Sequence, residues 1–190
     1  MESLGGATGY SNAYHSAMPV DPVQLKIVFY PHPVLRRKAQ PVPAIDEEVR
    51  GVAERMVQLM HEAKGVGLAA PQVGLSWRLF VANPSNEPGD DRVFINPSLE
   101  GASPIVDAAE EGCLSIPEVR GEVRRPASIS VRATDLEGRE FVLSSDELPA
   151  RVWQHEIDHL DGVLIIDKIT PLDRIANKKK LQELEARFKG

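Results

Sequence analysis

The chain has 190 residues, 42% of them hydrophobic, which is enough to bury one core without disulfide support, so one domain is expected. A formal net charge of −6 at pH 7 argues against broad nucleic-acid binding, and DNA is not an expected partner. A single cysteine excludes an internal disulfide, and without a run of eighteen apolar residues no membrane span is expected.

The first 20 residues contain Gly, Ser, Ala, Tyr and Asn without periodicity and carry no Lys or Arg. A secretory signal needs a basic start and an apolar core, and a transit peptide is usually rich in Arg, so neither is indicated. We therefore expect a disordered extension over residues 1–20 and a single domain over residues 21–190.

Hydrophobic patterns predict the elements of the first half of the chain. Residues 25–30 (LKIVFY) are rich in branched and aromatic side chains and predict a short strand. Residues 46–64 repeat apolar side chains at helical spacing behind an acidic cap, and predict a helix. Residues 79–83 and 92–97 predict strands on either side of a polar loop.

After this, residues 98–109 predict a strand edge and a loop. Alternating residues then predict three hairpin-like strands, at residues 119–125, 128–134 and 139–143.

The last part of the chain predicts a helix that Ser145 or Asp146 caps, then a strand at residues 163–166. A final helix begins near residues 170–173 and carries a charged surface. Its expected packing stripe consists of Leu181, Leu184 and Phe188.

Residues 151–160 (RVWQHEIDHL) predict a helix with an H-E-x-x-H pattern. His155 and His159 are four residues apart, so both can direct a ring nitrogen to one metal ion. Glu156 lies about 100° further round the helix, where it can reach a water that the metal activates but is not placed as a third ligand. Asp158 points away from the two histidines and is expected to form a salt bridge behind the helix.

Two histidines need at least one further ligand, and the sequence offers several positions. Ile165 stands where a metzincin pattern has its third histidine. Glu183 and Glu185 are near the spacing of Glu-type zincins, but in a charged helix. Cys113, within residues 111–115 (EGCLS), is the better candidate, because one thiolate and two imidazoles leave a fourth position open for water.

Three short motifs together resemble those of the peptide deformylases of bacterial type 1. Residues 65–72 (GVGLAAPQ) match G-x-G-x-A-A-x-Q, residues 111–115 match E-G-C-x-S, and residues 155–159 (HEIDH) match H-E-x-D-H. One such motif would be weak, but three in this order are specific. The resemblance covers about residues 24–188.

The resemblance implies that the domain is a hydrolase acting on nascent polypeptides, which removes the N-formyl group of the first formyl-methionine and releases formate. Glu156 is implied to accept a proton from water and to deliver it to the departing amine. Gln72 and the backbone N–H of Leu114 are implied to donate hydrogen bonds to the oxyanion.

The implied metal ligands are Cys113, His155 and His159. Spacing alone does not separate zinc from iron, nickel or cobalt. Members of the family typically use Fe(II), so Fe(II) is expected in the cell, and zinc, nickel or cobalt is compatible with purified protein.

The implied contacts with the peptide substrate surround the motifs. These residues are Gly65, Val66, Gly67, Glu111, Gly112, Arg120, Leu148 and Val152. The apolar side chains among them would line a pocket for methionine, the glycines would offer backbone to the peptide, and Arg120 would help to hold it.

For the fold, the resemblance implies an α+β arrangement of short, mostly antiparallel sheets wrapped around the H-E-x-x-H helix, with one helix before and one after. Related bacterial enzymes dock their C-terminal helix at the ribosome, so a transient ribosome contact is expected there, although the basic run at residues 178–180 also fits a solvated helix face. A bacterial cytoplasmic location is expected, with an organellar location as the alternative. The sequence does not indicate an oligomeric state.

Two other classes of function fit part of the sequence. A metalloendopeptidase would use H-E-x-x-H with a third ligand other than Cys113 and an open cleft. A catalytically inactive relative that binds the ribosome would be expected to have lost a motif residue, and none is lost here.

Overall fold

A computed structural model describes residues 19–189 of the chain. The extension expected at residues 1–20 lies outside the described residues up to residue 18. Within the described range, no helix combines the length and the hydrophobicity needed to cross a bilayer.

Residues 19–189 form two antiparallel sheets and four α-helices, which confirms the α+β class. The five-stranded sheet has the order β1 (Gly67–Ala69), β2 (Leu79–Ala82), β3 (Arg92–Glu100), β6 (Ile129–Thr134), β7 (Glu140–Ser145). The second sheet pairs β4 (Val106–Cys113) with β5 (Ile116–Pro126). The helices are α1 (Glu47–Glu62), α2 (Leu148–Leu160), α3 (Pro171–Ala176) and α4 (Lys178–Lys189).

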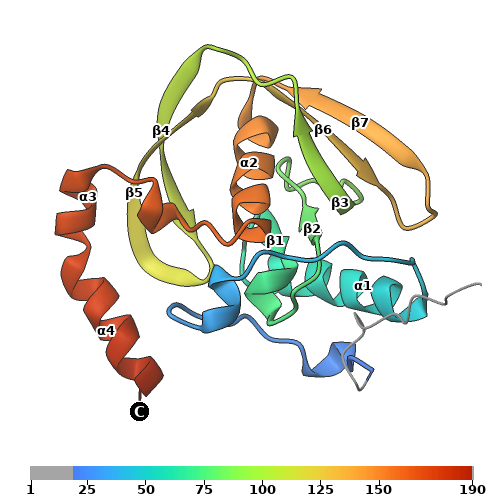
Figure 1. The fold of residues 1–190 in the computed structure, drawn as a ribbon, viewed down its shortest axis with the longest axis horizontal. Coiled ribbons are helices and arrows are strands. Elements are labelled where there is room, and N and C mark those ends of the chain that lie inside the picture. The colour runs from blue at the N-terminus through green and yellow to red at the C-terminus, as the bar shows by residue number, and fades with distance from the viewer. Residues whose placement is uncertain (1–18, 190) are drawn as a thin grey trace, which may run out of the picture.

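Helix α2 occupies the centre of the molecule, with β4 and β5 on one side of it and β3, β6 and β7 on the other (Figure 1). Strand β2 alternates its side chains between two helices: Leu79 and Val81 share a core with α1, while Phe80 packs in the core of α2. In that second core Phe80 stacks on Phe94 with ring centroids 4.3 Å apart, and Trp153 of α2 lies 5.9 Å from Phe94. The sheet is thus covered on both faces, which fixes the position of α2.

The helix predicted at residues 46–64 is confirmed as α1, and Asp46 caps it by accepting a hydrogen bond from Val49 N at 3.0 Å. The strands predicted at residues 79–83, 92–97, 119–125, 128–134 and 139–143 are confirmed as β2, β3, β5, β6 and β7. Of residues 98–109, where a strand edge and a loop are predicted, residues 98–100 end β3, residues 101–105 form a loop and residues 106–109 begin β4.

Two predicted strands are wrong. Residues 25–30 form no strand, because their backbone bonds to two separate segments: Val28 N donates to Gln72 O and Tyr30 N to Ser115 O, each at 2.8 Å. The apolar run at residues 163–166 leads instead into a 3₁₀ helix, Ile165–Asp167, whose isoleucines are buried. A short apolar run does not by itself distinguish a buried strand from a buried helical turn.

The cap predicted for the central helix is also wrong, because Glu147 is the N-cap residue and makes no side-chain cap bond. Ser145 instead accepts a hydrogen bond from Glu147 N at 3.1 Å.

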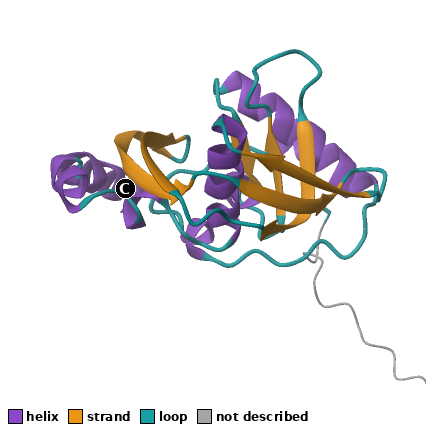
Figure 2. Cartoon of the chain, turned by 90° about the horizontal axis from the view of Figure 1, so that it is seen from above, coloured by secondary structure: helices purple, strands orange, loops and turns teal. Residues whose placement is uncertain are grey.

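The C-terminal segment is two helices rather than one. Asn177 separates α3 from α4, and its side-chain amide donates to Arg120 O at 2.7 Å. Leu181 and Leu184 are buried as predicted, but Phe188 is 49% exposed, so the packing stripe ends before it. These helices lie at the end of the molecule next to the two-stranded sheet (Figure 2).

Gly162, directly after α2, has φ +74°, and a Cβ at this position would lie 2.7 Å from the backbone oxygen of Arg36. Gly138 also has a positive φ, +80°, but a Cβ there would meet nothing within 4 Å. We predict that Gly138→Ala lowers the free energy of unfolding by about 1–2 kcal/mol through backbone strain alone. Gly162→Ala should lose about 1–3 kcal/mol more, because the backbone of Arg36 must shift.

Urea unfolding of the two variants beside the parent measures this difference. Equal losses in both variants would contradict the close approach of the two segments.

Candidate metal centre

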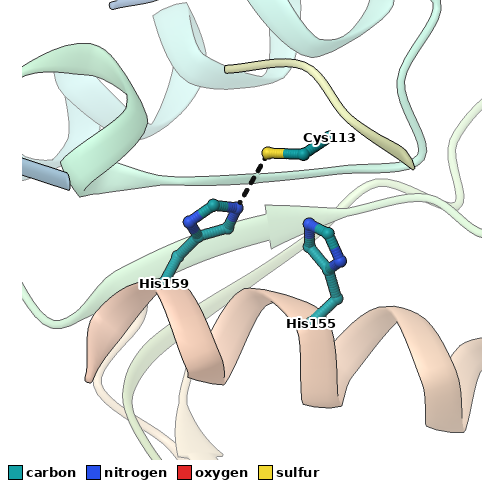
Figure 3. Close-up of side chains that lie close together, drawn as sticks. All are labelled: Cys113, His155 and His159. Atoms are coloured by element: carbon teal, nitrogen blue, oxygen red, sulfur yellow. Dashed lines mark hydrogen bonds between the residues drawn. The ribbon is translucent and has the colours of Figure 1, made fainter. Parts of the chain in front are cut away.

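The two histidines of the H-E-x-x-H pattern lie side by side on α2. One helical turn separates them, and the ring centroids of His155 and His159 are 4.9 Å apart at an interplanar angle of 70°. Figure 3 shows both rings standing on the helix and facing Cys113, which comes from another part of the chain.

Cys113 ends β4, where the register of the β4–β5 hairpin shifts between Gly112 and Cys113. Its Sγ lies 3.2 Å from Nε2 of His159. The potential ligand atoms of Cys113, His155 and His159 all lie within 4.8 Å of one another. Among residues 19–189 these three form the group that could hold a metal ion.

The chemistry of these donors fits a divalent transition metal. One sulfur and two imidazole nitrogens are ligands that zinc and iron accept, and three protein ligands leave a position for water or substrate. Two buried atoms beside the ligands, Oε2 of Glu156 and Nδ1 of His159, have no hydrogen-bond partner in the described structure. A buried acceptor without a donor is unfavourable by about 1–3 kcal/mol, which favours a bound water or substrate group at Glu156.

The other residues considered from the sequence as a third ligand make contacts elsewhere in the structure. Ile165 is buried in the apolar cluster beneath β5. Glu185 accepts a hydrogen bond from the Tyr30 hydroxyl at 2.7 Å, and Glu183 pairs with Lys180 at 3.4 Å.

Glu111 links the hairpin to the ligand helix. Its Oε2 lies 3.1 Å from Nδ1 of His155, while Arg125 donates to both carboxylate oxygens, at 2.6 and 2.8 Å, and Arg151 donates to Oε1 at 2.7 Å. Burial alone would raise the pKa of Glu111, but the hydrogen bonds from Arg125 and His155 hold it well below its usual range. An ionised Glu111 accepts the Nδ1 proton of His155 and so leaves Nε2 free for the metal.

Arg125 is only 2% exposed and also donates to Asp158 Oδ2 at 2.7 Å. Asp158 in turn pairs with Lys168 at 2.9 Å. The salt bridge predicted for Asp158 is therefore confirmed. It ties α2 to β5 through the same arginine that binds Glu111.

The pKa values of the ionisable residues at the centre depend on burial and on these contacts. Burial would lower the pKa of His155, but its interactions with Cys113 and Glu111 outweigh that effect and raise the pKa to about 10. Burial, with the nearby charges of His155 and Arg125, lowers the pKa of His159. Burial raises the pKa of Glu156 to about 7. The surroundings of His155 thus favour positive charge, which a divalent cation would also supply.

Gln72 and Gly67 come to the centre from the sheet side. The Gln72 amide is fixed by accepting from Ala69 N at 2.8 Å, and its Nε2 donates to Ser115 Oγ at 3.3 Å and to Cys113 Sγ at 3.6 Å. Gly67 leaves room for Glu156, since a Cβ there would lie 2.9 Å from Glu156 Cδ and closer still to Oε1.

A cavity of about 350 Å³ opens above the centre. All eight residues expected to contact substrate line it, together with Gln72, Cys113, Leu114, His155 and Glu156. His159 lies beneath, 1% exposed.

The sequence interpretation missed six lining residues: Lys64, Glu110, Ile116, Glu118, Val119 and Arg151. The helical spacing of Arg151, four residues before His155, could have indicated its place on the ligand face. The others have no comparable local signal.

Comparison with known proteins gives one consistent family. Residues 24–175 match the family model of polypeptide deformylase. The chain is 47% identical over 159 residues to a peptide deformylase of Thermotoga neapolitana, which covers 83% of this chain and 94% of that protein. It is 41% identical over 166 residues to peptide deformylase 1B, chloroplastic/mitochondrial, of Arabidopsis thaliana, covering 86% of this chain but only 61% of that protein.

Among solved structures, a peptide deformylase of Plasmodium falciparum is similar with a TM-score of 0.83 at 40% identity, covering 86% of this chain and 97% of that chain.

We predict that Arg125→Met lowers the free energy of unfolding by about 3–5 kcal/mol, because Glu111 and Asp158 lose the cation between them. Arg132→Met is the matched control, since Arg132 forms a solvent-exposed pair with Glu100 and should change stability little. Chemical denaturation measures both changes. A similar small loss in both variants would show that the buried network contributes little.

Proposed function

The chain belongs to the polypeptide deformylase family, and we propose that it hydrolyses the N-formyl group of formyl-methionine at the start of nascent polypeptides, releasing formate. The observation that carries this proposal is the convergence of Cys113, His155 and His159 beside a buried carboxylate, Glu156, at the base of one cavity. Hydrolysis of a formamide needs an activated water, a stabilised oxyanion and a proton for the amine, and these residues can supply each.

The shape of the cavity supports a peptide substrate. Among the strands of residues 19–189, β1 is an edge strand of the five-stranded sheet and β4 pairs with β5 alone, so each has a free edge. Gly67 of β1 and Gly112 of β4 both line the cavity. A peptide entering between these edges could pair with backbone as an added strand, while Val66, Leu148 and Val152 offer apolar surface to the methionine side chain.

Cys113, His155 and His159 would hold the metal, which when bound would polarise the formyl oxygen and lower the pKa of water. Glu156 is buried next to these ligands, so it can take the proton from water and pass it to the leaving amine. Gln72 Nε2 and the backbone N–H of Leu114 would donate to the oxyanion, each worth about 3 kcal/mol in the transition state.

We infer Fe(II) as the metal in the cell, with zinc, nickel or cobalt compatible with purified protein. The mixed sulfur and nitrogen donor set supports a transition metal of this group rather than magnesium or calcium. The choice of Fe(II) among them rests on the resemblance to the family.

A transient ribosome contact through α4 and a bacterial cytoplasmic location are part of the same proposal. Lys178 and Lys179 are exposed on α4, which lies at the end of the molecule, while Lys180 pairs with Glu118. The plant relative is named chloroplastic/mitochondrial, which supports an organellar location as the second candidate.

We predict that Glu156→Gln lowers kcat by about 10²–10⁴-fold, because the amide cannot take the proton from water. Metal content should stay unchanged, since the three ligands are intact. Glu147→Gln, at the exposed N-cap of the same helix where the side chain makes no cap bond, serves as the control and should retain full activity. Formate release from formyl-Met-Ala-Ser measures both variants. Parent-like turnover by metal-loaded Glu156→Gln would contradict the role of Glu156.

We further predict that Gly67→Ala lowers kcat roughly 10²-fold, because the added methyl group displaces the Glu156 carboxylate by about an ångström. Gly51→Ala in α1 adds a methyl group away from the cavity and should leave kcat unchanged. The same formate assay applies, with thermal unfolding to establish that both variants are folded. Full activity of folded Gly67→Ala would show that Glu156 does not need this space.

A further inference from the structure

The charged side chains at the mouth of the cavity are mostly paired with one another. Glu110 pairs with Arg120 at 3.5 Å, and Glu118 pairs with Lys180 at 2.7 Å. Deeper in the cavity, Glu111 is neutralised by the arginines described above. Because these acidic side chains are paired with basic ones, they present little net charge to a substrate.

Lys64 is the exception. It lines the cavity and is exposed, and within residues 19–189 its ammonium has neither an ion pair nor a hydrogen bond. Glu156, the other cavity-lining charge without an ion pair, is buried at the base. The mouth of the cavity therefore carries one uncompensated positive charge.

The backbone holds Lys64 in place. It follows the end of α1 with φ +55°, and its N–H donates to His61 O while Gly65 N–H donates to Met60 O, each at 2.9 Å. Glycine or asparagine is the usual residue in this left-handed position, and another side chain there is disfavoured by about 1–2 kcal/mol. The turn fixes where the side chain leaves the backbone, beside Gly65 and Val66 of the cavity wall.

We propose that Lys64 is a specificity-determining residue, which favours substrates with an acidic side chain shortly after the methionine over substrates with a basic one. This rests on the proposed deformylase function. Formyl-methionine itself carries no charge, so a cation at the mouth can only act on later residues. An extended peptide advances about 3.3 Å per residue, so its second to fourth residues would lie about 3–10 Å beyond the methionine, toward the mouth that Lys64 lines.

The expected preference is modest, because the interaction is exposed to water. One solvent-exposed ion pair changes kcat/KM by about two- to fivefold. The preference should shrink at high salt. Salt at 0.1 M screens charges that are more than about 10 Å apart, and at higher concentrations it also screens charges that are closer together.

The test compares kcat/KM for formate release from formyl-Met-Ala-Asp-Ser, formyl-Met-Ala-Asn-Ser and formyl-Met-Ala-Lys-Ser, all as C-terminal amides. Amidation removes the terminal carboxylate, so only the third side chain differs in charge. The parent should prefer Asp over Asn over Lys. Lys64→Asn, which suits the positive φ, should abolish the order, and Lys64→Glu should reverse it. Turnover of the Asn peptide checks that each variant is folded and active.

Lys26→Glu provides the matched control, since it changes the net charge of the chain equally at an exposed position outside the cavity. It should keep the order of the parent. Equal kcat/KM for the three peptides in the parent, or the same change in Lys26→Glu as in Lys64→Glu, would overturn the role of Lys64. Failure of the metal-loaded parent to release formate from any peptide would overturn the proposed function itself.

Discussion

The buried guanidinium of Arg125 holds the two halves of the site together. It joins Glu111 of β4 to Asp158 of α2, and burial of each of these charges without its partner would be unfavourable by several kcal/mol. Glu111 also accepts a hydrogen bond from His155. The position of this ligand therefore depends on Arg125, which acts on it only through Glu111. The hairpin that carries Cys113 and the helix that carries the histidines are therefore aligned by electrostatics.

Apolar packing fixes the same helix from its other side. Trp153 and Ile157 belong to the core shared with Phe80 and Phe94, while His155 and His159 turn toward Cys113. One helix thus fills the core and carries two of the three ligands. Because residue 67 is a glycine, strand β1 can approach α2 so closely that Glu156 is buried between the strand and the helix.

Sequence could predict the parts that depend on local pattern and not those that depend on distant partners. Helical periodicity identified α1, and the H-E-x-x-H spacing with a single cysteine indicated the ligand group. Residues 106–109, the first half of β4, are expected only as part of an edge and a loop, because most of their side chains are exposed and β5 supplies their pairing. Lys64 joins Glu110 and Glu118, from a distant part of the chain, in the lining of one cavity, and no short segment encodes that assembly.

The most direct measurement is formate release from formyl-Met-Ala-Ser by protein purified without oxygen, then stripped with a chelator and reloaded with Fe(II). The account predicts that stripping abolishes release and that about one Fe(II) per chain restores it, since one group of three ligands holds the ion. Release that persists in the stripped protein, or no release by folded protein with its metal restored, would contradict it.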